Sequence, residues 1–167
     1  MLYLIDTNIL ITAHKITNPI DIHPTYWEKL KEVFGRPDVL SIDKVKDEIF
    51  YFEDDLSNWC KENIDDHFWK SSENSIQEYA EIQNWASNKN YNQRALVEFA
   101  DYKNADPYLV AFALQNKRTK NTDITIVTLE VSAPESKKNV KLPDVCTDFQ
   151  VQFLNNNDFF RAIGISF

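Results

Sequence analysis

Four acidic side chains stand where the sequence could bring carboxylates together at a buried site. Asp6 directly follows an apolar run at residues 2–5, and Glu130 directly follows a β-branched run at residues 124–129. Both runs are typical of strands, and open α/β sheets bind their ligands beside the carboxyl ends of such strands. We therefore expect Asp6 and Glu130 to lie near one edge of a sheet.

Glu48 borders the apolar face of a helix predicted over residues 44–52. Three apolar residues recur there at helical spacing, namely Val45, Ile49 and Phe52. With a rotation of about 100° per residue, Glu48 falls at the margin of their face, whereas Asp47 points away from it. We expect Glu48 to be directed inward and Asp47 to be an ordinary surface acid.

Asp106 opens another predicted helix, which runs to about Asn116 and has Pro107 in its first turn. The same helical rotation places Asp106 on the side of the core residues Leu109 and Val110. Asp106 is therefore a second helical acid that we expect to face the core.

Each of these acids also has an ordinary structural interpretation. Asp6 and Asp106 could cap helices, and Glu130 could be a solvated loop acid. Four carboxylates gathered in one place, however, repel one another by roughly 4 kcal/mol per close pair at an effective dielectric near 20. They must then bind protons or a cation, and oxygen ligands without Cys or His suit Mg²⁺ or Mn²⁺. Such an ion activates water and stabilises the charge that develops in phosphodiester cleavage.

Strands and helices alternate at both ends of the chain, around a helical middle segment of about residues 54–103. Strands are predicted at 2–5, 124–129 and 151–154, and helices at 24–34, 44–52, 106–116, from 143 and at 158–163. The near-continuous apolar character of the first strand indicates a parallel sheet buried on both faces. We expect one domain over residues 1–167, an α/β fold in which helices sandwich a small central parallel sheet.

Glycine and cysteine counts exclude several classes of site. Gly35 and Gly164 are the only glycines in 167 residues, so a P-loop, a dinucleotide-binding fingerprint and a serine-hydrolase elbow cannot be built. Cys60 and Cys146 lie far apart and form no zinc motif. We expect both to be reduced, buried thiols.

The formal net charge of −8 is unevenly distributed. Residues 47–81 carry eleven acids and two bases, a charge of −9, whereas the remainder carries sixteen bases and fifteen acids, a charge of +1. The argument against a polyanionic substrate therefore applies to one segment only. That segment could receive a basic partner.

Basic residues lie on two predicted loops that flank the strand before Glu130. They are Lys117, Arg118, Lys120, Lys137, Lys138 and Lys141. They could hold the phosphates of a nucleic acid beside the metal, with Tyr108 available for base stacking, or they could simply be solubilising loop residues.

Four motifs together resemble those of PIN-domain ribonucleases. The opening Leu-Ile-Asp6-Thr-Asn8-Ile-Leu is similar to the first motif of that family, and Lys44-Val-Lys-Asp-Glu48-Ile resembles the helix that bears its second acid. Ala105-Asp106-Pro-Tyr-Leu-Val-Ala resembles the helix with the third acid, and Ile126-Val-Thr128-Leu-Glu130 the strand that ends in Thr and the fourth acid. The resemblance spans nearly the whole chain and is greatest to an uncharacterised prokaryotic branch related to VapC-type toxins.

The resemblance implies a PIN-like three-layer α/β/α sandwich, a Mg²⁺ or Mn²⁺ site and cleavage of single-stranded RNA. Asp6, Glu48 and Asp106 would be metal ligands, Asn8 would hold Asp6 and a water molecule, and Thr128 would orient the loop with the fourth acid. The family usually has Asp at the fourth position, where this chain has Glu130. Asp144 is an alternative source of that carboxylate, and Asp101 is the next candidate after it.

Two other functions remain as alternatives. A haloacid-dehalogenase-like phosphatase also begins with a strand that ends in Asp, but it needs a second Asp where this chain has Asn8. A catalytically silent binding module would use the acids only as helix caps. No apolar run is long enough to span a membrane and no basic segment opens the chain, so we expect a cytoplasmic protein. The four tryptophans are expected to make core or dimer contacts.

Overall fold

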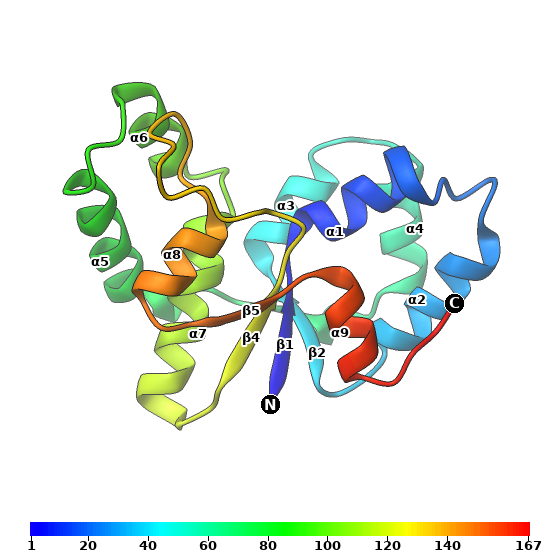
Figure 1. Ribbon diagram of the computed structural model, residues 1–167. Helices are drawn as coiled ribbons and strands as arrows, with labels where there is room; N and C mark the ends of the chain where they lie inside the picture. Colours follow the sequence, from blue (N-terminus) through cyan, green and yellow to red (C-terminus); the bar gives the residue numbers. More distant parts are fainter.

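The sheet contains five strands, all parallel, in the order β3-β2-β1-β4-β5. A computed structural model describes the whole chain, residues 1–167, and Figure 1 shows its ribbon. The strands are β1 (Leu2–Ile5), β2 (Val39–Ile42), β3 (Trp69–Lys70), β4 (Ile124–Val127) and β5 (Gln152–Leu154).

Nine α-helices surround this sheet. They are α1 (Thr7–Thr12), α2 (Pro24–Phe34), α3 (Asp43–Phe50), α4 (Asp55–Asn63), α5 (Ile76–Ser87), α6 (Gln93–Ala100), α7 (Asp106–Lys120), α8 (Leu142–Asp148) and α9 (Asn156–Ala162). Three short helical segments, η1 (Ala13–Thr17), η2 (Asp66–Phe68) and η3 (Glu73–Ser75), complete the structure. None of the helices has the length and apolar character that crossing a membrane requires.

The helices form two layers, one on each side of the sheet. In Figure 1, α5, α6, α7 and α8 lie on one side, and α1, α2, α4 and α9 lie on the other. The predicted α/β sandwich with a small central parallel sheet is therefore confirmed. Strands β2 and β4 are buried along their whole length, as expected for a parallel sheet covered on both faces.

The register of the central strands places two chain segments side by side at the carboxyl edge of the sheet. Ile5 at the end of β1 pairs with Val127 at the end of β4. The next residues, Asp6 and Thr128, therefore leave the sheet next to each other. Strand β2 ends at the same edge and continues directly into α3.

Several predicted elements differ from those observed. Strand β2 was not expected, because its four residues are too few to show a hydrophobic pattern in the sequence. The helix predicted to residue 52 ends at Phe50, so Phe52 is 51% exposed rather than part of the buried face with Val45 and Ile49. The helix expected to end near Asn116 continues to Lys120, where Asn121 adopts the left-handed conformation that ends it.

Both cysteines and two of the tryptophans are buried in the core. Cys60 and Cys146 are unpaired and almost inaccessible to solvent, as expected. Trp27 and Trp69 are also buried. Burial raises the pKa of the Cys60 thiol to about 12, so that this thiol stays protonated.

Candidate functional site

Four acids from distant parts of the chain form what we term the carboxylate cluster. It consists of Asp6 after β1, Glu48 on α3, Asp106 at the start of α7 and Glu130 after β4. The negative charges of both glutamates and of Asp6 raise the pKa of Asp106, so these groups lie within electrostatic reach of one another. The structure thus brings together the four acids that the sequence analysis selected.

Asp6 is buried and does not cap the helix that follows it. It occupies the position before α1, but its side chain accepts no capping hydrogen bond. Its Oδ2 instead accepts a hydrogen bond of 2.7 Å from the Thr128 hydroxyl. Burial, and then the charges of Glu130 and Glu48, raise the pKa of Asp6 to about 7. Burial of the charged Asp6 carboxylate is therefore energetically unfavourable, and the side chain contributes little to the local structure.

Thr128 connects Asp6 to the loop that carries Glu130. Its Oγ1 accepts hydrogen bonds from Asn8 Nδ2 at 3.3 Å and from the Glu130 backbone N–H at 3.1 Å. Asn8 Oδ1 in turn accepts from the Leu129 N–H at 3.0 Å. The geometry agrees with an orienting role for Thr128, whereas Asn8 contacts Thr128 and Leu129 rather than Asp6.

Asp106 is the acid with the least support from hydrogen bonds. No side-chain hydrogen bond caps the start of α7. The backbone N–H of Asp106 donates to Asn104 Oδ1 at 3.0 Å. No hydrogen bond stabilises the charged form of its carboxylate. Burial first, and then neighbouring negative charge, raise its pKa well above the ordinary value, while Lys141 is the one cation that opposes this shift.

Glu48 and Glu130 are each held by one oxygen. Glu48 Oε1 accepts from the Ala105 N–H at 2.7 Å, and Glu130 Oε2 accepts from the Leu142 N–H at 2.8 Å. The second oxygen of each carboxylate has no donor from the protein. The buried Thr7 hydroxyl approaches Glu48 but makes no hydrogen bond of normal geometry. Burial raises the pKa of Glu48 as well.

The donor chemistry of the carboxylate cluster suits a hard divalent cation. No three His, Cys, Asp or Glu side chains converge closely enough to form a ready-made metal site. The cluster nevertheless offers carboxylate oxygens without protein donors, and burial first, then repulsion among them, raise the pKa values of Asp6 and Asp106. A cation would offset that repulsion, and oxygen donors of this kind are those of Mg²⁺ and Mn²⁺.

Asp144 and Asp101, the alternative fourth acids, lie in other surroundings. Asp144 accepts hydrogen bonds from the Ser132 hydroxyl and, at 3.1 Å, from the Ala133 N–H. Asp101 is exposed and accepts from the Lys103 N–H at 2.9 Å. Asp144 thus holds the loop before α8. The charge of Glu130, in contrast, acts on Asp6 and Asp106 and contributes to raising their pKa values.

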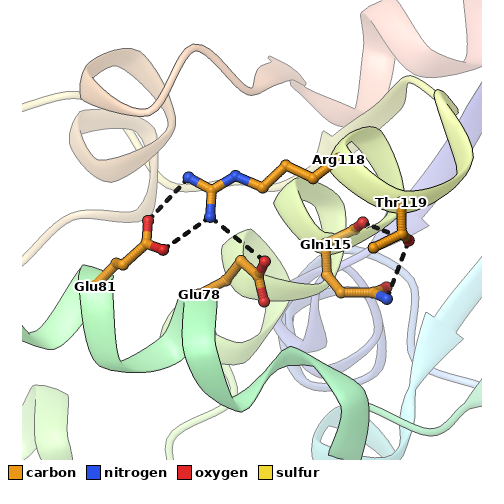
Figure 2. A network of polar contacts seen from close by, with 5 residues as sticks. All are labelled: Glu78, Glu81, Gln115, Arg118 and Thr119. Atoms are coloured by element: carbon orange, nitrogen blue, oxygen red, sulfur yellow. Dashed lines mark hydrogen bonds and ion pairs between the residues drawn. The ribbon is translucent and has the colours of Figure 1, made fainter.

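The first group of expected RNA-binding residues lies far from the carboxylate cluster. Lys117, Arg118 and Lys120 occupy the last turn of α7, and at 1.5 Å per residue Arg118 is about 18 Å along the helix from Asp106. Figure 2 shows the Arg118 guanidinium bridging to α5, where it donates to Glu81 at 2.8 and 2.9 Å and to Glu78 at 3.4 Å. These residues do not flank the site as expected, because they belong to the end of α7 that lies at the opposite edge of the sheet.

The second group lies on the loop between β4 and α8. Lys141 lines a small cleft of about 150 Å³ together with Asp106 and Glu130. Lys138 is exposed, and Lys137 lies over the Tyr91 ring at 5.1 Å. Lys141 is therefore the expected phosphate-binding residue that the structure brings to the cluster.

An aromatic groove beside Glu48 was not expected from the sequence. Tyr51, Phe52 and Tyr102 line it, and its volume is about 490 Å³. Tyr108, the aromatic side chain that was expected to stack with bases, is instead stacked on Tyr79 at 4.4 Å. The adjacent pair Tyr51-Phe52 at a helix end was the available signal, and it was missed because Phe52 was assigned to the buried face.

Comparison with protein families gives one match. Residues 3–167 match the family model of a domain of unknown function, DUF4411, and the chain belongs to that family. No match was found among curated proteins or solved structures. The family assignment names no activity, so the function has to be inferred from the site.

Proposed function

We propose that this protein is a Mg²⁺- or Mn²⁺-dependent endoribonuclease that hydrolyses phosphodiester bonds of single-stranded RNA. The observation that carries the proposal is the gathering of the buried Asp6 and the partly buried Asp106 with two further carboxylates, without an arginine to neutralise them. The motif resemblance to PIN-domain ribonucleases supports it independently. The same resemblance favours a role as the toxin of a toxin–antitoxin pair, with an antitoxin protein as partner.

Asp6, Glu48, Asp106 and Glu130 would hold the cation. When bound, the cation supplies a water of lowered pKa and stabilises the developing charge on the phosphate. Thr128 keeps one oxygen of Asp6 in place and fixes the N–H of Glu130. Lys141, beside Asp106, can bind a non-bridging phosphate oxygen of the RNA.

The geometry around Asn8 argues against a haloacid-dehalogenase-like phosphatase. That mechanism needs an acid two residues after the first aspartate to protonate the leaving group. Asn8 cannot do so, and both ends of its amide are engaged with Thr128 and Leu129. Its side chain therefore holds the loop after β4.

A cleavage assay tests the proposal. The parent protein and an Asp106→Asn variant would be incubated with labelled single-stranded RNA and Mn²⁺ or Mg²⁺. Loss of a ligand that stabilises the transition state costs several kcal/mol, so we expect cleavage to fall at least about a hundredfold. Asp21→Asn is the matched control, because Asp21 is an exposed acid that lies outside the carboxylate cluster.

Two results would count against a nuclease. Cleavage that persists unchanged in Asp106→Asn and in Asp6→Asn would show that the activity comes from elsewhere. A parent protein that neither cleaves RNA nor gains thermal stability from Mn²⁺ would support the silent binding module instead. Equal loss in the Asp21→Asn control would point to general damage from charge removal.

A further inference from the structure

A groove of about 490 Å³ opens directly beside the carboxylate cluster. It is bordered by Ile11 of α1, by the end of α3 and by the 101–104 segment before α7. Glu48 belongs to both the groove and the cluster, because its Oε1 accepts from the Ala105 N–H just beyond the 101–104 segment. A ligand lying in the groove would therefore reach the proposed catalytic centre.

Three aromatic rings line the groove and are unusually exposed. Tyr51 is 69%, Phe52 51% and Tyr102 68% accessible to solvent. The Tyr51 and Phe52 rings are nearly perpendicular, with centroids 5.1 Å apart. Exposed aromatic side chains gathered in one concave place mark a binding site more often than a structural need. The rings offer faces on which planar groups can stack.

Lysine ammonium groups lie close to the same rings. Lys103 Nζ is 5.3 Å from the Tyr51 ring centroid and 5.7 Å from that of Tyr102. Lys15 Nζ is 5.5 Å from the Phe52 centroid. The groove thus combines aromatic rings with positive charges, the two features by which proteins bind single-stranded nucleic acid.

We propose that this groove binds the unpaired bases of a single-stranded RNA and leads its backbone to the carboxylate cluster. The inference rests on the proposed ribonuclease function and adds the substrate-binding surface to it. Bases stack on Tyr51, Phe52 and Tyr102, while Lys15 and Lys103 contact the phosphates between them. Base stacking of this kind tolerates any sequence, because every base has a flat face.

The charge of the groove is compatible with this ligand. Lys44 and Lys103 line the groove and Lys15 covers its Phe52 ring, against the two acids Asp47 and Glu48. Glu48 is a proposed cation ligand, so its charge is offset in the working enzyme. The three lysines then face one exposed acid, Asp47, in a protein whose overall charge is −8.

Binding to a short, labelled, unstructured RNA in EDTA tests the proposal without interference from cleavage. Tyr51→Ala and Tyr102→Ala should each raise the dissociation constant about fivefold to a hundredfold, the range that loss of one stacked base gives. Tyr51→Phe should bind as the parent does, because the ring face remains. Ile76→Ala is the control for loss of an equally exposed apolar side chain, since Ile76 is also 68% exposed. A duplex of the same sequence should bind more weakly and respond little to the alanine variants.

The outcomes separate this inference from the proposed function. Parent protein that cleaves RNA, with binding unchanged in both alanine variants, overturns the groove and leaves the nuclease standing. RNA binding that needs Tyr51 and Tyr102, in a protein that cleaves nothing with Mn²⁺ or Mg²⁺, supports the groove and overturns the nuclease. Equal weakening by Ile76→Ala, or equal binding of the duplex, also overturns base stacking as the mode of binding.

Discussion

Two acidic clusters lie at opposite ends of helix α7, and they differ in how their charge is balanced. At the carboxyl end of the helix, the guanidinium of Arg118 binds Glu81 and Glu78 of α5 (Figure 2). Its hydrogen bonds lower the pKa of Glu81. At the amino end, Asp106 and its neighbours lack such a partner, and the pKa of Asp106 is raised. We refer to the first group as the Arg118 cluster.

The comparison shows that burial alone does not identify a functional acid. Glu78 is 6% exposed and Asp6 is 2% exposed, so the two are buried to a similar degree. Glu78 forms an ion pair with Arg118, a cation supplied by the same chain. Asp6 faces other carboxylates instead. Lys141 is the one cation whose charge acts on Asp106, but it makes no ion pair with the carboxylate cluster, and this is why we propose a cation site there.

The largest expected difference is in the pH dependence of stability without metal. The pKa of Asp6 is raised from 3.8 to about 7, so folding favours its protonated form. This contribution to stability is fully present below about pH 4 and is lost as the pH rises through about 7, a total of about 4 kcal/mol. Chemical denaturation in EDTA should therefore show Asp6→Asn gaining stability over the parent between about pH 4 and pH 7.

The Arg118 cluster should respond in the opposite direction. Because the pKa of Glu81 is lowered, its contribution is present at neutral pH and is lost as the pH falls through the folded-state pKa. Glu81→Gln should thus be slightly less stable than the parent at neutral pH and equal to it in acid. An Asp6→Asn variant that loses stability at neutral pH would contradict the difference between the clusters.

Next in size is the stabilisation that a divalent cation provides. Mn²⁺ at a hundred times its dissociation constant should raise the free energy of unfolding by about 2.7 kcal/mol, or about 5–10 °C in Tm for a chain of this length. The double variant Asp6→Asn/Asp106→Asn should lose this shift, whereas Arg118→Ala should keep it. A thermal-shift titration with Mn²⁺ and then EDTA measures both. Equal shifts in all three proteins would show that Mn²⁺ binds somewhere else.

Removing Arg118 should destabilise the fold by a somewhat smaller amount. Arg118→Ala leaves the nearly buried Glu78 without its charged partner, and we expect a cost of about 1–2 kcal/mol. Arg94→Ala is the matched control, because the Arg94–Glu98 pair on α6 is exposed and such pairs contribute about 0.5 kcal/mol or less. Denaturant midpoints distinguish the two. RNA cleavage should be unaffected by either change.

The smallest expected effect comes from the hydroxyl that connects the carboxylate cluster to its loop. Thr128→Val keeps the side-chain shape but removes the hydrogen bonds to Asp6 and from the Glu130 N–H, so cleavage should fall about tenfold. Thr125→Val is the control, since Thr125 lies on β4 shortly before Thr128 and its hydroxyl donates to Gln152 rather than to the site. Similar losses in both variants would mean that Thr128 supports the strand rather than the site.

The carboxylate cluster could be found from the sequence because its acids occupy simple positions. Asp6 and Glu130 follow apolar strands, and a helical rotation was enough to separate Glu48 from Asp47. Parallel strands end at a common edge, so sequence-distant residues after them meet without any knowledge of long-range packing. The position of Asp106 beside the other acids and the exposed state of Asp47 agree with that reasoning.

The basic residues and the groove depended on where helices end, which the sequence predicted less well. Helix α7 extends four residues beyond Asn116, which carries Arg118 into contact with α5. Helix α3 ends at Phe50, two residues early, which turns Phe52 out to solvent. Helix ends are set by tertiary contacts and local capping, and a few residues decide which face a side chain joins.

The single backbone anchors of Glu48 and Glu130 have a consequence for conformational entropy. Fixing a glutamate side chain costs up to about 2 kcal/mol in lost rotamers, a cost that a flexible ligand must meet at the moment of binding. Here the Ala105 and Leu142 N–H groups already immobilise both side chains in the folded protein. In the proposed cation site, the extra rotatable bond of a glutamate is therefore restrained before any cation binds.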